Sequence, residues 1–362
     1  MSNPFDDPAG SFMVLVNREE QYSLWPAFAA VPEGWTVALD ETTRDACMTF
    51  ITETWHDLRP KSLRDTMARD ARDARGKTLL KPRFEDVQAH YDLSDDFFAL
   101  FLDPTRTYSC AYFERVDMTL QEAQIAKIDL ALGKLGLMQG MTLLDVGCGW
   151  GSTMIRAIER YDVNVIGLTL SENQQTHVQR VFADSDSPRS KRVLLEGWEQ
   201  FHQPVDRIVS IGAFEHFGYD RYDDFFTMAY GVLPDDGVML LHTITALTPS
   251  QVVEGGMPLT PELAEFSQFI VTEIFPGGRL PSIEKVQDHG AKAGFRLTRR
   301  QSLQPHYART LDIWAANLEA HEDEAIAMQS EEVYERYIKY LTGCAKGFRV
   351  GYIDVNQFTL EK

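Results

Sequence analysis

A loop with glycine at every second position follows a short apolar run. Leu143 to Val146 predicts a buried strand, and Gly147, Gly149 and Gly151 come directly after it. Glycine permits positive φ and carries no Cβ, so a small ligand can lie against this backbone while Asp145 holds the loop. The spacing is GxGxG, unlike the GxGxxG of dinucleotide sites or the GxxxxGK[ST] of phosphate loops. The loop therefore favours S-adenosylmethionine over NAD or ATP, with a simple strand-to-helix turn as the alternative.

Further polar side chains follow the next two predicted strands. Thr169, Ser171 and Gln174 can offer hydroxyl and amide groups to a ribose, and in company with the glycine loop we expect Ser171 to bind the ligand and not only to cap a helix. Trp198 and Glu199 can bind an adenine, because an indole stacks on it and a carboxylate accepts from its amino group.

Two groups suited to acid–base chemistry follow the fourth and fifth strands. Glu215 lies among aromatic residues, and His242 ends an apolar run. A single histidine after a buried strand is more often a satisfied core residue, but several polar groups at one sheet edge favour a site. The segment from Thr107 to Tyr112 can join them, since its small residues at 109–111 let backbone amides approach a bound group.

Alternating apolar strands and amphipathic helices must position these groups. The predicted strands cover residues 143–146, 163–168, 193–196, 206–210 and 238–242, with helices over 154–161 and 171–182. Repeated βα units predict an α/β fold with a doubly wound, mainly parallel, Rossmann-like sheet that binds ligands at the carboxyl ends of its strands. A helical lid is expected before it.

A separate small body precedes this fold. Strand-like runs at 11–17, 21–25 and 35–39, followed by a helix over 40–55, predict an α+β domain with a three-stranded antiparallel sheet. Such a core has little room for a catalytic cleft, so a binding module is expected. Alternating charges over 64–81 indicate a linker, which gives domains at 1–63 and 82–362.

Composition excludes several classes of function. The 362 residues carry a net charge of −19, which argues against nucleic acid or anionic membranes as partners. Four separated cysteines argue against a disulfide framework or a zinc site, and no run is long and apolar enough to span a membrane. A cytoplasmic protein without a metal is therefore expected.

The first body resembles the MbtH-like proteins, which are small partners of nonribosomal peptide synthetase adenylation domains. The resemblance is carried by Asn3–Asp6, Ser23–Pro26, Pro32, Gly34–Trp35 and Trp55–Ser62. It implies that Ser23, Leu24, Trp25 and Trp35 contact the partner, whereas core packing is the alternative for the two tryptophans.

From Phe84 onward the chain resembles the mycolic acid cyclopropane synthases and the wider cyclopropane-fatty-acid synthase family, which depend on S-adenosylmethionine. The resemblance is carried by Gln88–Phe98, Asp103–Pro104, Tyr108–Phe113, Asp145–Gly151, Gly167–Ser171, Gly197–Glu199, Phe214–Phe217, Glu273–Pro281, Gln304–Tyr307 and Tyr340–Cys344.

The resemblance implies roles for individual residues. The expected cofactor pocket comprises Tyr108, Ser109, Asp145, the three loop glycines, Thr169, Leu170, Gln174, Trp198 and Glu199. A bicarbonate ion is expected between Glu215, His242, Tyr307 and the backbone around Cys110 and Ile211. Aromatic faces that could stabilise a carbocation belong to Tyr91, Phe217, Phe275 and Phe348, with ordinary packing as the alternative.

Two positions bear on the outcome of the reaction. Relatives that add water to the cation carry glutamate where this chain has Gly212, so ring closure is favoured over hydroxylation. Cys344 matches a cysteine regarded as an active-site residue in the family, although no step requires a thiolate and packing is as good an explanation.

These observations predict transfer of a methylene carbon to a cis double bond of a long acyl chain, which could be carried by an acyl carrier protein. The apolar stretch from Phe266 to Phe275 predicts a lipid-facing helix, or else a core helix. Two other functions stay open. One is an adenylation-domain partner with a passenger methyltransferase body, and the other is O- or N-methylation of a peptide or polyketide. The sequence does not distinguish a natural fusion from an engineered one.

Overall fold

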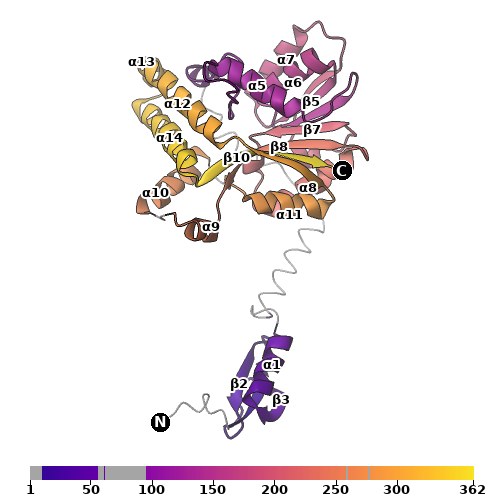
Figure 1. Cartoon of the computed structure of the whole chain (residues 1–362), viewed down its shortest axis with the longest axis vertical. Coiled ribbons are helices and arrows are strands. Elements are labelled where there is room, and N and C mark those ends of the chain that lie inside the picture. The colour runs from indigo at the N-terminus through magenta and orange to yellow at the C-terminus, as the bar shows by residue number, and fades with distance from the viewer. Residues whose placement is uncertain (1–9, 56–60, 62–94, 258–259, 276–277) are drawn as a thin grey trace. The chain divides into compact units, whose positions relative to one another are not determined.

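The computed structural model describes residues 10–55, 61, 95–257, 260–275 and 278–362. The chain divides into two compact units, Met1–Leu79 and Leu80–Lys362, which are described separately (Figure 1). The charged linker predicted over 64–81 lies outside the described residues, as do Tyr91 and most of the segment expected to form the first part of the lid.

The first unit is a three-stranded antiparallel sheet with one helix. Its elements are β1 (Ser11–Asn17), β2 (Tyr22–Pro26), β3 (Trp35–Thr43) and α1 (Arg44–Thr54), with the strand order β2-β1-β3. Phe12, Val14 and Cys47 form its buried core. This confirms the predicted fold, but the helix begins at Arg44 and not at residue 40. Strand β3 continues to Thr43, whose side chain then caps α1 by accepting from the amide of Ala46 at 3.3 Å.

The second unit is built on a seven-stranded sheet of order β6-β5-β4-β7-β8-β10-β9. Its strands are β4 (Thr142–Val146), β5 (Asn164–Thr169), β6 (Lys191–Leu195), β7 (Arg207–Ile211), β8 (Val238–Ala246), β9 (Arg296–Ser302) and β10 (Ile353–Glu361). The first five are parallel, which confirms the mainly parallel α/β sheet, whereas β10 is antiparallel to both β8 and β9. The sequence did not predict β9 or β10.

Helices cover both faces of this sheet. On one face lie α5 (Leu120–Leu132), α6 (Ser152–Tyr161) and α7 (Glu172–Ala183), and on the other lie α8 (Tyr222–Val232) and α11 (Ile283–Ala293). Neighbouring strand residues point to opposite layers: Leu143 packs with the first group and Leu144 with the second. The buried strands are therefore apolar on both faces, as expected of a parallel sheet.

The remaining helices lie beside the sheet, and all except the short helix at 249–254 contribute to a third, largely aromatic cluster (Figure 1). They are α4 (Asp95–Ala99), α9 (Pro249–Glu254), α10 (Pro261–Phe269) with the π-helical turn Ile270–Ile274, α12 (Gln304–Ala320), α13 (Glu322–Met328) and α14 (Glu331–Val350). Short 3₁₀ turns at Trp198–Gln200, Phe214–His216 and Tyr219–Arg221 complete the described secondary structure of this unit. None of the described helices is long and apolar enough to cross a membrane.

Candidate functional site

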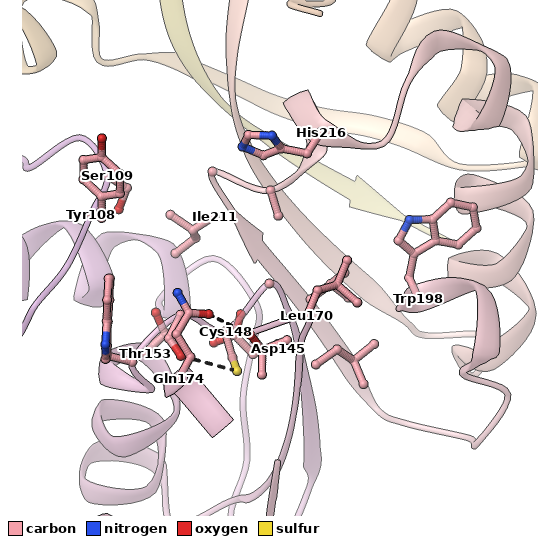
Figure 2. A pocket seen from close by; sticks show the side chains of 18 of the residues that line it. Tyr108, Ser109, Asp145, Cys148, Thr153, Leu170, Gln174, Trp198, Ile211 and His216 are labelled. Atoms are coloured by element: carbon pink, nitrogen blue, oxygen red, sulfur yellow. Dashed lines mark hydrogen bonds between the residues drawn. The ribbon is translucent and has the colours of Figure 1, made fainter. Parts of the chain in front are cut away.

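A cavity of about 140 Å³ opens at the carboxyl ends of the parallel strands, where the strand order reverses at β4 (Figure 2). Such a reversal leaves a crevice, because the connections from neighbouring strands diverge to opposite faces. All the predicted cofactor-binding residues except Gly151 line this cavity.

The three glycines of the loop have different functions. All have positive φ, at 81°, 53° and 88° for Gly147, Gly149 and Gly151. A Cβ at Gly147 would lie 2.4 Å from the Cβ of Ala213, whereas a Cβ at Gly149 would meet nothing within 4 Å. Gly151 is the N-cap of α6 and faces Val178, so it shapes the turn. The open backbone for a ligand is therefore at Gly149.

Hydroxyl and amide groups line the middle of the cavity. Thr169 donates to the side-chain oxygen of Gln174 at 2.7 Å, which fixes both side chains. Ser171 is absent from the cavity wall and caps α7, where its hydroxyl accepts from the amide of Gln174 at 3.3 Å. The expectation that Ser171 contacts the ligand was therefore wrong.

One end of the cavity is formed by Trp198 and Glu199. Trp198 is buried and packs against Phe217 at 5.6 Å between ring centroids. Glu199 accepts from the guanidinium of Arg221 at 2.8 Å, an ion pair that the sequence did not predict. The pair holds the carboxylate beside the indole in the cavity wall.

Tyr108 and Ser109 lie on the other side of the cavity from Trp198 (Figure 2). The Ser109 hydroxyl accepts from the ammonium of Lys127 on α5 at 2.6 Å. Asp145 at the carboxyl end of β4 lines the same cavity, and its Oδ2 has no hydrogen-bond partner among the described residues. Burial raises the pKa of the Asp145 carboxyl to about 7, and nearby Lys127 opposes that rise.

A second, larger cavity of about 610 Å³ adjoins the first, and most of its wall is apolar. Four residues line both cavities: Tyr108, Ser109, Gly212 and His216. The predicted apolar segment lines it through Phe266, Ile270, Val271 and Phe275, while Phe269 and Ile274 are buried in the aromatic cluster. The segment thus has one face toward a cavity and one toward the core.

Three predicted polar groups meet in the wall of this second cavity. Glu215, His242 and Tyr307 all line it, and all three are at least nine-tenths buried. Glu215 Oε1 accepts from the amide of Ile244 at 2.6 Å, and His242 Nδ1 faces the side-chain nitrogen of Gln357 at 3.3 Å. Glu215 Oε2 and His242 Nε2 have no hydrogen-bond partner among the described residues.

Burial disfavours the charged forms of these groups. It raises the pKa of the Glu215 carboxyl and of the Tyr307 phenol, and it lowers the pKa of the His242 imidazole well below its usual value. His242 is therefore uncharged near pH 7, and because its Nδ1 accepts from the side-chain nitrogen of Gln357, its Nε2 carries the proton and can donate. Glu215 Oε2 and His242 Nε2 can therefore each form a further hydrogen bond at this wall.

The cysteines differ in their surroundings. Cys110 lines the second cavity, but its thiol faces the carbonyl of Ala111 at 3.1 Å, and burial raises its pKa. Cys344 also lines that cavity, and burial raises its pKa to about 12, so it is a thiol and not a thiolate near pH 7. Ile211 lines the first cavity only. All four cysteines are free.

The candidate cation-stabilising aromatics are divided between the cavities. Phe275 and Phe348 line the apolar cavity, and Phe348 packs against Tyr307 at 4.7 Å between ring centroids. Phe217 lines only the first cavity, so its contact is with the expected adenine end. Tyr91 lies outside the described residues.

In the first unit the four candidate partner-binding residues are half-buried. Ser23, Leu24 and Trp25 lie on β2, and Trp35 begins β3. Several large apolar side chains elsewhere in this unit are exposed, and Phe28 is 81% exposed.

Sequence reasoning missed three residues of the site, namely Lys127, Arg221 and His216. His216 lies within the segment Phe214–Phe217, but its neighbours in the sequence do not indicate that it lines both cavities. Lys127 did leave a signal: with Gln124 it interrupts a helix face that otherwise reads Ala123, Ile128 and Ala131. A polar pair three residues apart on a buried face predicts a buried polar contact.

Comparisons with known proteins match each of the two units to a protein family. A family model described as mycolic acid cyclopropane synthetase matches residues 78–358, and one described as MbtH-like protein matches residues 1–67. Cyclopropane mycolic acid synthase MmaA2 of Mycobacterium tuberculosis is 74% identical over 283 residues, which cover 78% of this chain and 99% of that protein. Methoxy mycolic acid synthase MmaA3 of the same species is 69% identical over 287 residues, covering 79% and 98%.

Solved structures of cyclopropane synthases also match this chain. The cyclopropane synthase MmaA2 from Mycobacterium tuberculosis has a TM-score of 0.77 and covers 78% of this chain and 99% of its own. Mycolic acid cyclopropane synthase CmaA1, complexed with SAH and CTAB, has a TM-score of 0.77 at 72% identity and covers 79% and 100%.

Proposed function

Because the chain belongs to the mycolic acid cyclopropane synthetase family, we propose that it adds a methylene carbon from S-adenosylmethionine to a cis double bond of a long acyl chain. The acyl chain is of the mycolic type or is bound to a carrier. The observation that carries this proposal is the pair of adjoining cavities, one with polar groups at a sheet edge and one largely apolar, which share the wall formed by Tyr108, Ser109, Gly212 and His216.

The first cavity suits the methyl donor. S-adenosylmethionine supplies an activated methyl group on a sulfonium ion. Trp198 and Glu199 can hold its adenine, Thr169 and Gln174 its ribose, and Gly149 leaves room beside the backbone. The methionine part then extends toward Tyr108 and Ser109, at the wall shared with the second cavity.

The second cavity suits a long apolar chain. Its volume of about 610 Å³ and its mostly apolar wall can exclude water from the reacting carbons. In the proposed reaction, an alkene carbon forms a bond to the methyl carbon while the bond from sulfur to that carbon breaks. Positive charge passes to the acyl chain, and loss of a proton from the transferred carbon closes the ring.

The buried polar groups fit a bicarbonate ion. Bicarbonate supplies a base for the proton that must leave. Glu215 Oε2 can accept from the hydroxyl of the ion, while His242 Nε2 and the Tyr307 hydroxyl can donate to its oxygens. A neutral His242 avoids a second full charge in a buried wall, which the lowered pKa of that imidazole favours.

The wall around the reacting carbons favours ring closure. Phe275 and Phe348 present aromatic rings to the apolar cavity, where their π faces can stabilise positive charge. Gly212 offers no carboxylate that could hold a water molecule beside the cation. A thiolate at Cys344 is not needed, and the pKa of about 12 argues against one.

For the first unit we propose binding to an adenylation domain of a nonribosomal peptide synthetase. The match to the MbtH-like model supports this, as does the presence of Trp25 and Trp35 at half-buried positions beside exposed apolar residues. We place this domain at 1–63 and the methyltransferase domain at 82–362. Their presence in one chain would bring lipid modification close to a peptide assembly line.

Mass spectrometry of reaction products tests the enzymatic proposal. Incubation with S-adenosylmethionine and a panel of unsaturated acyl carriers and acyl lipids should yield a product that has gained one CH₂ and lost its alkene. Changing Glu215 to Gln should lower turnover by roughly 100-fold or more, because the buried acceptor for the ion is lost, while the melting temperature stays near that of the wild type.

The same assay can overturn the proposal. A methyl group found on oxygen or nitrogen would replace cyclopropanation by a different methyl transfer. Full turnover by the Glu215→Gln variant would remove Glu215 from the mechanism. A matched substitution at an exposed carboxylate outside both cavities, Glu335→Gln, should leave turnover within about twofold of wild type if surface charge is unimportant.

A further inference from the structure

Lys127 is a fully buried lysine in the wall of the first cavity. It is 0% exposed, and its one hydrogen bond among the described residues is the 2.6 Å contact to the Ser109 hydroxyl. Gln124, one turn earlier on α5, donates to the carbonyls of Thr107 and Ser109 at 3.1 and 2.8 Å. Two buried side chains of α5 thus hold the segment that separates the two cavities.

The ammonium of Lys127 has spare hydrogen-bonding capacity. A lysine carries three donors, and burial without an anionic partner is costly. The carboxylates of Asp103 and Asp145 are its acidic neighbours, but among the described residues its hydrogen bond is to the Ser109 hydroxyl and not to either carboxylate. Burial accordingly lowers the pKa of Lys127 to about 8. An additional anion at this end of the cavity would satisfy the remaining donors.

The proposed donor has one anionic group, its α-carboxylate. With the adenine at Trp198, the amino-acid part reaches the opposite side, where Figure 2 shows Tyr108 and Ser109. Arg221 lines the cavity on the adenine side and is engaged by Glu199. The cations left on the amino-acid side are Lys127 and Arg106, and Arg106 is only half-buried.

We propose that Lys127 is the counter-charge of the α-carboxylate of S-adenosylmethionine, acting on it together with the Ser109 hydroxyl that it polarises. This inference rests on the proposed use of S-adenosylmethionine. It makes Lys127 a positioning residue: it holds the donor so that the sulfonium methyl group faces the wall shared with the apolar cavity. It also explains why a helix face that could be apolar contains a lysine.

Binding of three nucleosides to the unaltered full-length protein gives the first test. The probes are S-adenosylhomocysteine, its decarboxylated form S-adenosyl-3-thiopropylamine, and 5′-methylthioadenosine, which lacks the whole amino-acid part. Isothermal titration calorimetry should show S-adenosylhomocysteine binding at least about tenfold more tightly than the decarboxylated compound, because a charge-assisted contact is lost. Equal affinity for these two ligands would overturn the proposal.

Two variants then assign the contact. In Lys127→Met, the affinity for S-adenosylhomocysteine should fall at least about tenfold while the affinity for 5′-methylthioadenosine changes less than about twofold. Arg106→Met removes the other cation on this side of the cavity. It should leave the ratio of the affinity for S-adenosylhomocysteine to the affinity for 5′-methylthioadenosine near that of the wild type. If Arg106→Met reduces this ratio and Lys127→Met does not, the proposal is wrong.

A folded Lys127→Met protein could instead lose affinity for S-adenosylhomocysteine and for 5′-methylthioadenosine to the same extent. Lys127 would then only support the cavity wall, which also overturns the proposal. Should that variant fail to fold, the three-nucleoside series on the wild-type protein still decides whether the carboxylate is recognised. Failure of the wild-type protein to bind S-adenosylhomocysteine at all would instead contradict the proposed function. The two failures are therefore distinguishable.

Discussion

Single residues at the junction of the cavities should determine what happens to the proposed cation. Gly212 has a φ of 71° and lines both cavities, and an added Cβ would be in ordinary contact with the Cβ of Ser109 at 3.8 Å. There is room for a side chain at this position, although the backbone favours glycine. The identity of residue 212 can therefore alter the product without filling the cavity at its Cβ.

Replacing Gly212 by Glu should shift part of the product from the cyclopropane to a hydroxylated methyl branch. The new carboxylate can hold a water molecule beside the cation, and water addition then competes with proton loss. Liquid chromatography with mass spectrometry distinguishes the products, since the hydroxylated one contains one additional water. The Gly212→Ala variant is the control, because it bears a similar backbone cost of about 1 kcal/mol without a carboxylate. Identical product ratios for the two variants would contradict this prediction.

The imidazole of His216 gives a pH-dependent contribution to stability. Burial lowers its pKa to about 4 in the folded protein, whereas the unfolded chain titrates near pH 6.5. Below about pH 6.5 the unfolded state therefore binds a proton that the folded state excludes, so stability is complete above that pH and falls as the pH drops toward 4.

Denaturant unfolding at pH 7.5 and pH 5 can test this contribution. The wild-type protein should lose more free energy of unfolding between these pH values than the His216→Gln variant. Asp145, with a raised pKa, has the opposite pH dependence but is present in both proteins. Parallel pH profiles for the two proteins would show that His216 does not titrate as described.

At the scale of elements, α10 and α14 contact one another at a glycine. A Cβ at Gly343 of α14 would lie 2.2 Å from the ring of Phe266 on α10, so the ring occupies the space that a side chain at 343 would need. Phe266 lines the apolar cavity. The helix pair therefore determines part of the shape of the cavity proposed to hold the acyl chain.

The Gly343→Ala variant should displace the Phe266 ring and alter the choice of acyl chain. Because the ring can turn more easily than the helices can separate, we expect a stability change within about 1–2 kcal/mol. Competition between acyl substrates of different length should show the longest ones losing the most in kcat/KM. A variant with the same preference as wild type would show that this contact does not limit the cavity. Gly231→Ala, where a Cβ would meet nothing within 4 Å, is the matched control.

Prediction from the sequence worked best for strands whose own residues form a continuous apolar run. The apolar runs gave β4 to β8 to within a few residues, because strands buried on both faces are continuously apolar. Strand β9 contains three arginines and is largely exposed, and β10 is rich in buried polar residues such as Asn356 and Gln357, so neither resembles a buried strand. Their pairing depends on partners distant in the sequence.

The candidate site could be predicted in part for the same reason. Glycine spacing and polar residues after strands pointed to one sheet edge, and Thr169, Trp198 and Glu215 do lie there. The ion pair of Glu199 with Arg221 and the contact of Lys127 with Ser109 join separate elements, and no local pattern encodes them. For Ser171 the sequence predicted a ligand contact, but the hydroxyl caps helix α7, which is a local role.

At the scale of the whole molecule, two compact units with different proposed partners share one chain. The first unit has a small core around Phe12, Val14 and Cys47, and it exposes Phe28 and Val37. A small domain with exposed apolar side chains is typical of an interaction module. Binding by this unit and catalysis by the other should therefore respond to different substitutions.

Trp35→Ala should weaken binding to an adenylation domain by roughly tenfold or more while cyclopropanation proceeds at the wild-type rate, because a half-buried tryptophan is a frequent interface anchor. Surface plasmon resonance with an immobilised adenylation domain and the product assay measure the two activities. Glu33→Ala, at an exposed neighbouring turn, is the control. Circular dichroism must show an intact fold. A fall in cyclopropanation with unchanged adenylation-domain binding would contradict the separation.

The position of β10 has a consequence for synthesis on the ribosome. Residues 353–361 lie between β8 and β9 and pair with both, so the sheet has a gap until they have left the exit tunnel. The three-stranded unit, by contrast, has all its strands after 43 residues have emerged. During translation the unpaired edges of β8 and β9 therefore stay open until β10 emerges, which favours non-native strand pairing in that interval.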